Sequence, residues 1–330
     1  MQAKSTMAPS SAQRGVALIT VLLILSVMVV VATNMTSRLQ MELMRVQGQV
    51  MSQRAYWYGN AAEALVKMTL KNTLNDDDVV SLSQAWATSG MSFPLDGGTI
   101  SGEIKDRQGC FNLNALDEAN KADGARPRIA NQFQALLESL EVEGYYAEQI
   151  TDSTRDWLDA DGVTVSSQGA EDSFYEGRGV PHLTANAPMV DVSEFRAIQG
   201  VSPGVYKKLK PYLCAIPQRE WLLNVNTVAL DQPQVFQALF TPLLSEDSAQ
   251  SLLDERPQNG WSSKEDFFAA STLSGLQISD EVKAQVVVSS QYFELVGVAE
   301  FDETKVALNA LFQASKKEVK TLRRQYGGVQ

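Results

Sequence analysis

The stretch SAQRGVALITVLLILSVMVVVATNMTSR, residues 11–38, decides the fold of this chain. It has no charged side chain from Val16 to Ser37. As an α-helix that run would be about 33 Å long, at a rise of about 1.5 Å per residue, which is enough to cross the hydrocarbon core of a bilayer. A cleaved secretory signal has a shorter apolar core followed by a small-x-small cleavage site, and no such site follows here. The stretch therefore predicts a membrane-spanning helix that stays on the protein.

The helix is predicted to continue beyond the apolar run, to about residue 75. Apolar residues recur at spacings of three and four as far as Met68, and no proline occurs between Ser11 and Pro94. Such periodicity is typical of an amphipathic helix with one apolar face. Because that face needs cover, we expect the second half of the helix to pack on the chain's own globular part or on neighbouring subunits.

The composition narrows the kinds of partner. The 330 residues carry a net charge of −11, and a surface of that sign repels phosphate backbones and attracts hard cations such as calcium. One histidine, His182, and two cysteines, Cys110 and Cys214, exclude a zinc cluster of cysteine and histidine and leave little for histidine-based catalysis. By spacing alone the cysteines form either one disulfide or two buried thiols, and an exported location favours the disulfide.

The rest of the chain predicts an α+β domain with a helical insertion. Residues 99–106 alternate between apolar and polar as a half-buried strand does, and residues 284–313 are rich in Val, Phe and Tyr, which favours two or three antiparallel strands. Residues 115–280 contain short helices joined by glycine turns, the helix-hairpin-helix pattern. We therefore expect residues 76–114 and 281–330 to form one sheet-bearing domain, split by the helical block.

The C-terminal end carries a turn and a basic group. Asp302 to Thr304 is expected to turn one strand back on the next. The basic residues that follow are expected to form a solvated edge or tail, and they are Lys316, Lys317, Lys320, Arg323 and Arg324.

One motif suggests hydrolysis, but its neighbours contradict that function. GVSPG, residues 200–204, matches the G-x-S-x-G pattern of a nucleophile elbow. Pro203, directly after the serine, has no amide proton for an oxyanion hole, and His182 precedes the serine instead of following it. We interpret the motif as a turn between two short helices, with Pro203 at a helix start, and expect a protein that is not an enzyme.

The helix-hairpin-helix units raise DNA binding as an alternative function. In that mode hairpin glycines present their amides to phosphate, with lysine or arginine nearby. The segment LLSEDSAQSLL has Glu246 and Asp247 in place of those glycines, so we favour structural reuse of the motif. The alternative is a single-span envelope protein of the DNA-uptake type.

An acidic loop within residues 155–175 is the strongest candidate site. Its carboxylates are those of Asp159, Asp161, Glu171 and Asp172. Carboxylates two apart in a turn can converge on one cation, with a main-chain oxygen, that of Val163, completing the arc. The loop departs from an EF-hand because its glycine, Gly162, stands at position four. The residues alone leave two readings open, a metal site or a solvated acidic loop with helix-capping aspartates.

The beginning of the chain resembles a type IV prepilin. The sequence RGVALITVLLI places Gly15 just before a hydrophobic helix, and GCFNLNALDEAN, residues 109–120, is similar to the segment at which the pilin sheet hands over to an inserted domain. Most members have glutamate at the fifth position after the cleavage site, and here, counted from Val16, that position holds Thr20. This departure is typical of one subgroup, the K-type minor pseudopilins of the type II secretion system. The resemblance covers nearly the whole chain.

The resemblance implies a processing step and a fold. Residues 1–15 would be a leader, which a prepilin peptidase removes between Gly15 and Val16 before it methylates the new amino terminus. The mature chain would have a type IV pilin-like fold, in which a long N-terminal helix packs on an antiparallel sheet and a large all-helical domain is inserted into the sheet region. The helix would span the inner membrane once, with the globular part in the periplasm.

The resemblance also implies partners and a cofactor. The subunit would lie at the tip of the periplasmic pseudopilus that helps to secrete folded proteins, with minor pseudopilins of the I and J types and without nucleic acid. Members of the subgroup are similar in having calcium in the helical domain. Ligands in this loop would be Asp159, Asp161, Val163, Glu171 and Asp172. A second ion would draw on Asp156 or Asp191, and a disulfide between Cys110 and Cys214 would help calcium to stiffen the insertion.

Overall fold

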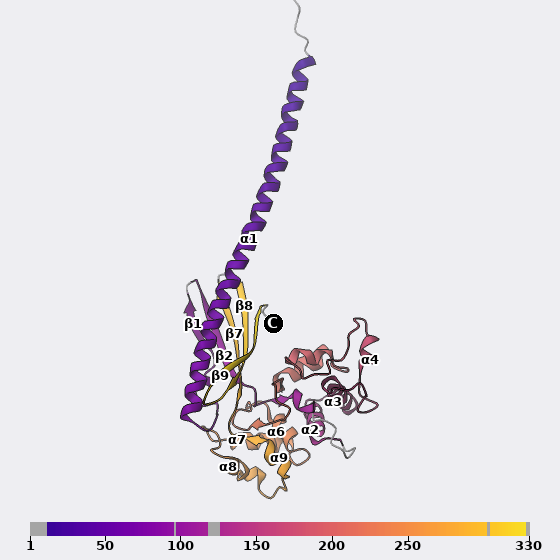
Figure 1. The fold of residues 1–330 in the computed structure, drawn as a ribbon, viewed down its shortest axis with the longest axis vertical. Helices are drawn as coiled ribbons and strands as arrows, with labels where there is room; N and C mark the ends of the chain where they lie inside the picture. Colours follow the sequence, from indigo (N-terminus) through magenta and orange to yellow (C-terminus); the bar gives the residue numbers. More distant parts are fainter. Residues whose placement is uncertain (1–11, 96, 118–125, 302–303, 328–330) are drawn as a thin grey trace, which may run out of the picture. The chain divides into compact units, whose positions relative to one another are not determined.

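The computed structural model describes residues 12–95, 97–117, 126–301 and 304–327 (Figure 1). Residues 1–11 of the predicted leader, and residues 302–303 of the predicted turn, lie outside the described residues. The chain forms two compact units, Met1–Tyr58 and Gly59–Gln330.

One helix, α1, runs from Ala12 to Asp76. It is the described helix that is long and apolar enough to cross a membrane, by length and composition. Polar side chains in its apolar part are satisfied by the helix itself. The Thr20 hydroxyl donates to the Ala17 carbonyl at 2.9 Å, and Asn34 Nδ2 donates to the Val30 carbonyl at 2.8 Å. Such bonds remove the cost of placing a polar group among apolar surroundings.

The second unit contains a five-stranded antiparallel sheet in the order β1-β2-β7-β8-β9. Its strands are β1 (Met91–Leu95), β2 (Gly98–Asp106), β7 (Tyr292–Phe301), β8 (Thr304–Ala314) and β9 (Val319–Gly327). The sheet therefore combines a hairpin from before the helical block with three strands from after it. This arrangement confirms the predicted α+β class, with a long helix and an antiparallel sheet.

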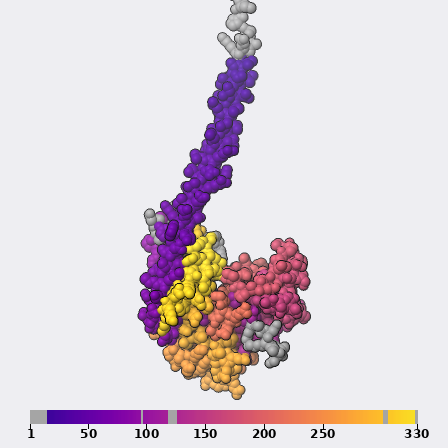
Figure 2. All heavy atoms as spheres, viewed as in Figure 1, coloured from indigo at the N-terminus to yellow at the C-terminus, as the bar shows by residue number. Residues whose placement is uncertain are grey.

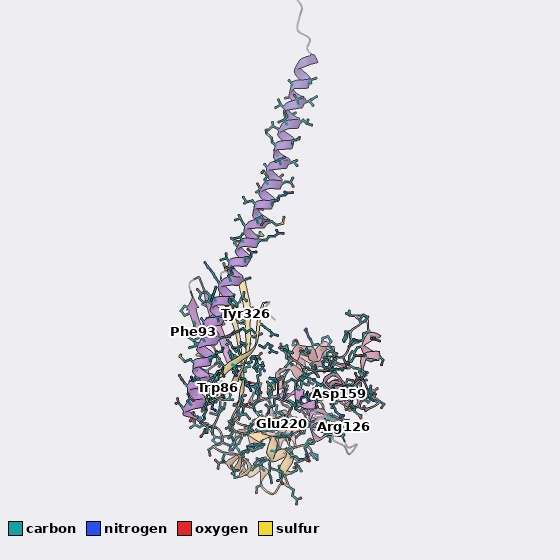
Figure 3. All side chains as sticks on the ribbon, viewed as in Figure 1. Trp86, Phe93, Arg126, Asp159, Glu220 and Tyr326 are labelled. Atoms are coloured by element: carbon teal, nitrogen blue, oxygen red, sulfur yellow. A yellow bond between two sulfur atoms is a disulfide. The ribbon has the colours of Figure 1, made fainter. Side chains whose placement is uncertain are left out.

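One face of the sheet packs on the second half of α1. Val66 and Leu70 of the helix join Phe293 of β7 and Phe312 of β8 in one buried cluster. Trp86, in the 3-10 turn η1 (Ala85–Ala87), covers the end of this core, with its ring centroid 5.3 Å from that of Phe293 (Figure 3). The sheet thus covers a face of the helix formed by Val66, Leu70 and Leu74. The predicted apolar face is not the covered one, because its residues Trp57, Leu65 and Met68 are exposed.

The helical block follows β2 and ends before β7. Its helices are η2 (Leu113–Asp117), α2 (Arg128–Ser139), α3 (Gly144–Leu158), α4 (Asp172–Glu176), η3 (Val192–Ala197), α5 (Pro203–Leu209), η4 (Lys210–Tyr212), α6 (Pro233–Leu239), α7 (Glu246–Asp254), α8 (Lys264–Phe268), η5 (Ser271–Leu273) and α9 (Asp280–Gln285). They enclose a core of their own, in which Phe133 of α2 stacks on Phe111 at 4.9 Å between ring centroids and meets Phe195 edge-on at 6.1 Å.

The structure corrects several details of the prediction. The insertion is not all helical, because β3 (Phe111–Asn112) pairs in parallel with β4 (Leu213–Cys214), and β5 (Leu223–Asn224) pairs in parallel with β6 (Val286–Val287). Such short strands have too few residues for a visible alternation. Strand β1 lies in the turn-rich residues 74–98, for which the sequence predicts turns and a possible short helix but no strand. Helix α9 begins one residue before the predicted C-terminal part of the sheet domain.

A disulfide joins Cys110 to Cys214 across the first of these strand pairs. It closes a loop of 104 residues in sequence. Because β3 and β4 lie side by side, the bond ties the start of the insertion to its middle. The structure thus contains the pairing that the resemblance implied.

The predicted turn in GVSPG is confirmed. Ser202 caps α5 and its hydroxyl accepts a hydrogen bond from the Val205 amide, while Pro203 occupies the start of the helix. Gly200 has a φ of +83°, and a Cβ there would come within 2.9 Å of the Ile150 side chain. The serine is therefore used as a helix cap, and the glycine is required by the turn.

Candidate metal centre

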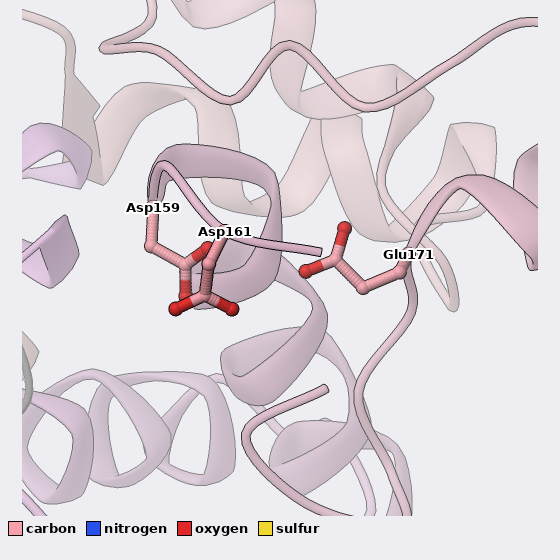
Figure 4. Close-up of side chains that lie close together, drawn as sticks. All are labelled: Asp159, Asp161 and Glu171. Carbon is pink, nitrogen blue, oxygen red and sulfur yellow. The ribbon is translucent and has the colours of Figure 1, made fainter. Parts of the chain in front are cut away.

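Three carboxylates of the acidic loop converge in the insertion. Asp159 follows the last residue of α3, Asp161 lies two residues later, and Glu171 directly precedes α4. One oxygen of each lies within 4.8 Å of the others, and Figure 4 shows Glu171 directed toward the two aspartates. The residues that follow α3 and the residue that precedes α4 thus place their negatively charged side chains close together.

Two of these carboxylates have one oxygen each that receives no hydrogen bond from the described residues. Asp159 Oδ1 and Glu171 Oε1 are buried and have no hydrogen-bond partner among the described residues. The Glu171 residue is 5% exposed, whereas Asp161 is exposed. A buried charged oxygen without a donor is costly unless a cation compensates it. The arrangement therefore suits a cation better than a solvated loop.

The cluster raises the pKa of its own members. Burial, reinforced by the charge of Asp161, raises the pKa of Asp159 to about 6. Burial, reinforced by Asp159, raises the pKa of Glu171 to about 7. Each shift means that the charged form is disfavoured in the protein alone, and a bound cation would reverse that preference.

The donor set fits calcium. All three side chains offer oxygen, the ligand that hard divalent cations prefer, and calcium tolerates the irregular geometry of a loop with six to eight ligands. A cavity of about 360 Å³ lies beside the cluster and is lined by Asp159, Asp161, Arg155 and Asp117, among others. Asp159 and Asp161 therefore border open space.

Helix α3 provides the template on which the loop is folded. Asp152 and Asp156 stand one turn apart on its buried side. Asp152 accepts a hydrogen bond from the Ser166 hydroxyl at 2.6 Å, and Asp156 accepts one from the Val165 amide at 2.9 Å. A Cβ at Gly169 would come within 2.0 Å of Asp156 Oδ2, so the loop can approach only with glycine there. These contacts hold the segment between the two groups of ligands.

The contribution of Asp152 and Ser166 to this loop was not predicted from the sequence. A signal existed, because two aspartates four residues apart on a helix face that is otherwise buried must bond to something inside the protein. Asp156, which we expected near a second ion, lies behind the cluster and has its pKa raised to about 7, by burial first and also by the charges of Glu171 and Asp159. Its Oδ1 supports the loop, while its Oδ2 is buried without a hydrogen-bond partner among the described residues, so ligation by Asp156 stays a prediction.

Two other predicted ligands are engaged elsewhere. Asp172 Oδ1 accepts hydrogen bonds from the Thr184 amide at 2.9 Å and its hydroxyl at 2.6 Å, and these bonds lower the pKa of Asp172. Asp191 caps η3 and pairs with Arg323 at 2.8 Å. Val163 donates its amide to Asp161 Oδ1 at 2.9 Å, and ligation by its carbonyl remains a prediction.

The helix hairpin proposed for DNA begins with acidic residues. Ser245 caps α7, and Glu246 and Asp247 occupy its first turn. Acidic side chains beside the free amides of a helix start satisfy the positive end of the helix dipole and repel phosphate. The hairpin is therefore built for packing inside the insertion.

Comparison with known proteins agrees with this architecture. Models of the family "Type II secretion system (T2SS), protein K" match residues 109–218 and 223–289. Type II secretion system protein K of Aeromonas hydrophila is 43% identical, over 96% of this chain and 98% of that protein, and the Pectobacterium carotovorum protein of the same name is 34% identical, over 96% and 98%.

A solved structure is similar as well. It is a chain of the GspK-GspI-GspJ complex from the type 2 secretion system of enterotoxigenic Escherichia coli, with a TM-score of 0.78 and 35% identity, over 86% of this chain and 100% of that chain. The DNA-binding alternative gains no support from these comparisons. The family models, the relatives that match over nearly their whole length and the similar solved structure lead to one conclusion: this chain belongs to the type II secretion system protein K family.

Proposed function

We propose that this chain is a minor pseudopilin that forms the tip of a periplasmic pseudopilus and helps to secrete folded proteins across the outer membrane. The observation that carries this proposal is the combination of a pilin-like body with a large insertion, shared over 86% of the chain with a relative solved in complex with GspI and GspJ. Pseudopilins of the I and J types are accordingly the proposed partners. The role is structural, and no catalytic step is assigned to the chain.

The leader is proposed to be removed, and the apolar helix that follows it is proposed to stay in the inner membrane. A prepilin peptidase would cut between Gly15 and Val16, and α1 would hold the globular part on the periplasmic side. Thr20 fits a tip position because its hydroxyl is already bonded within the helix and it carries no charge. A lone charge at that depth would cost about 2.5–3.5 kcal/mol unless a neighbour neutralised it.

Calcium is the proposed ligand of the insertion. Asp159, Asp161 and Glu171 would hold it, with the Val163 carbonyl as a further oxygen. When bound, the ion would neutralise the repulsion among these carboxylates and fix the loop between α3 and α4. A second ion at Asp191 is not proposed, since that carboxylate is paired with Arg323.

The processing proposal is tested by the intact mass of the protein extracted from membranes. We expect loss of the first 15 residues and the addition of one methyl group. A full-length mass, or a cut near Ala32, would contradict it.

The assembly proposal is tested by extracting the full chain together with I-type and J-type pseudopilins. We expect one stable complex of the three proteins and no binding of duplex DNA at low salt. Tight, salt-sensitive DNA binding would favour the DNA-uptake alternative instead. Thr20→Glu should impair tip-specific incorporation, and a variant that entered the whole fibre without loss of secretion would refute the role given to Thr20.

A further inference from the structure

The sheet has a second face, opposite α1, whose side chains differ from those of the first. Glu294 of β7, Leu311 of β8 and Arg323 of β9 are cross-strand neighbours and therefore project from one face. The adjacent residues Phe293 and Phe312 belong to the core on the α1 side. Alternation along the strands thus places an acid and an arginine on the face that is turned away from α1.

Neighbouring side chains of β9 point to opposite faces, and a bulge places Thr321 on the same face as Arg324. The register shifts between Leu311 and Phe312, so Arg323 lies opposite Leu311 and Thr321 lies opposite Phe312. On the α1 side, Arg324 Nε donates to Glu63 at 2.6 Å and Thr321 donates to the same carboxylate at 3.1 Å. The predicted solvated edge is thus present, because β9 is the last strand of the sheet and Lys316, Lys317 and Lys320 are exposed. Arg323 is the exception, with its side chain 14% exposed.

On the second face, four side chains form an alternating chain of charges, which we call the seam. Its members are Arg107, Glu294, Arg323 and Asp191. Arg107 Nε donates to Glu294 at 2.7 Å, Arg323 Nη2 donates to the other Glu294 oxygen at 2.8 Å, and Arg323 Nη1 lies 2.8 Å from Asp191. Arg323 also donates to the Val190 carbonyl. The side chains of Arg323 and Glu294 are 14% and 8% exposed, so water screens the seam weakly.

Apolar contact at the seam is small. Ile216 of the insertion meets Tyr292 and Leu311 of the sheet in a cluster of these three buried residues. The two large apolar clusters of this unit lie elsewhere, one between α1 and the sheet and one inside the insertion. The described contact between this face of the sheet and the insertion thus combines a small apolar cluster with the charged side chains of the seam.

The insertion holds its side of the seam in place with two buried asparagines. Asn114 accepts a hydrogen bond from the Met189 amide at 2.7 Å and donates to the Met189 and Ile216 carbonyls, each at 2.9 Å. Asn112 accepts from the Ile216 amide at 3.2 Å. Both belong to the FNLN segment quoted above, and they place Ile216 and the residues before Asp191 against the sheet.

A second group of hydrogen bonds, centred on Asp106 and called the root here, joins the insertion to the sheet near its other edge. Asp106, at the end of β2, accepts hydrogen bonds from Asn224, Thr227 and Ser290. In the sheet order, β9 is three strands away from β2, which is about 14 Å at a spacing of about 4.8 Å. The root and the Arg323–Asp191 contact therefore hold the insertion at two places that are well separated across the sheet.

We propose that Arg323 sets the orientation of the insertion relative to the sheet, acting through the seam as a latch on the last strand (Figure 2). In Figure 2 the C-terminal strands, in yellow, lie between the second half of α1 and the insertion. Because adjacent side chains of β9 engage Glu63 and Asp191, the strand couples α1 to the insertion. Because the acidic loop belongs to the insertion, Arg323 also sets the orientation of that loop relative to the sheet. This effect does not require a metal in the loop.

The test measures the distance distribution between a spin label in the sheet and one in the insertion, in the full chain extracted in detergent with its disulfide intact. Exposed Ser92 of β1 and Lys207 of α5 are suitable label positions. We expect a narrow distribution for the native protein and a broadened, shifted one for Arg323→Ala. Lys320→Ala is the matched control on the same strand, because Lys320 pairs with Glu318 at the surface, and it should leave the distribution narrow.

A second variant keeps the result decisive if Arg323→Ala fails to fold. Asp191→Asn removes the charge paired with Arg323 but keeps an oxygen that can cap η3. It should broaden the distance distribution and shift it in the same direction as Arg323→Ala does. The latch is refuted if folded Arg323→Ala or Asp191→Asn protein gives a distance distribution as narrow as that of the native protein. It is also refuted if Lys320→Ala broadens the distribution equally.

Discussion

Replacing Glu171 with glutamine is expected to change the stability of the metal-free and calcium-loaded protein in opposite directions. Without calcium, Glu171 is a buried carboxylate that faces Asp159 and Asp161, so glutamine should relieve repulsion and stabilise the fold. With calcium, the same substitution removes a charged ligand and should reduce the stabilisation that the ion provides. A residue with only a structural role would not produce this crossing.

The magnitude follows from the carboxyl group's surroundings. The pKa of Glu171 rises from 4.5 to about 7, a difference of about 2.5, which at about 1.36 kcal/mol per pKa unit corresponds to about 3 kcal/mol against the charged form. Because solvent beside the exposed Asp161 screens part of this, we expect a gain of about 1–2 kcal/mol without calcium. Calcium at about 100 times its Kd would stabilise the native protein by about 2.7 kcal/mol, and the variant by less than about 1 kcal/mol.

The assay is urea unfolding followed by tryptophan fluorescence, in chelator and in excess calcium. Asp172→Asn is the matched control, because Asp172 is the next residue and is not among the three carboxylates that converge. The Thr184 hydroxyl that it binds also lies 3.4 Å from Glu171 Oε2, and the charge of Asp172 contributes to the raised pKa of Glu171. The control should therefore weaken the protein in both conditions and keep most of the calcium effect. The reasoning fails if Glu171→Gln keeps the native calcium effect, or if it destabilises the metal-free protein as Asp172→Asn does.

Other predictions concern pH, the disulfide and the core. In chelator, the raised pKa values of Asp156 and Glu171, both about 7, mean that the folded state binds more protons than the unfolded state. The stability that these two groups contribute is fully present below about pH 4 and is lost as pH rises through about 7. Urea midpoints at about pH 5 and about pH 8 will check this, and calcium should reverse the trend. Replacing Cys110 and Cys214 with alanine should cost about 4–5 kcal/mol in urea unfolding, because their loop is long, and an unchanged midpoint would contradict the assigned pairing. Phe133→Ala should cost about 3–5 kcal/mol in the same assay, since Phe133 is fully buried between two rings, and a loss below about 1 kcal/mol would contradict its central place in the insertion core.

Local patterns predicted much of the fold. The apolar run and the absence of proline predicted α1, and the alternation in residues 99–106 predicted β2, because both depend on neighbours in sequence. Strands β3 and β5 were missed because two residues cannot show a period. Strand β1 was missed because it lies among turn residues, and Pro94 is tolerated there because β1 forms the edge of the sheet.

The sequence by itself determined the long apolar helix, the order of sheet, helical block and sheet, and the acidic loop as the place to look for a metal. The tertiary structure alone decided which acids act together. It joined Glu171 to Asp159 and Asp161, left Asp172 with Thr184, and gave Asp191 to Arg323. The physical reason is that a carboxylate's role is set by the donors and charges around it in space. Those neighbours come from segments that only the packing of the core brings together.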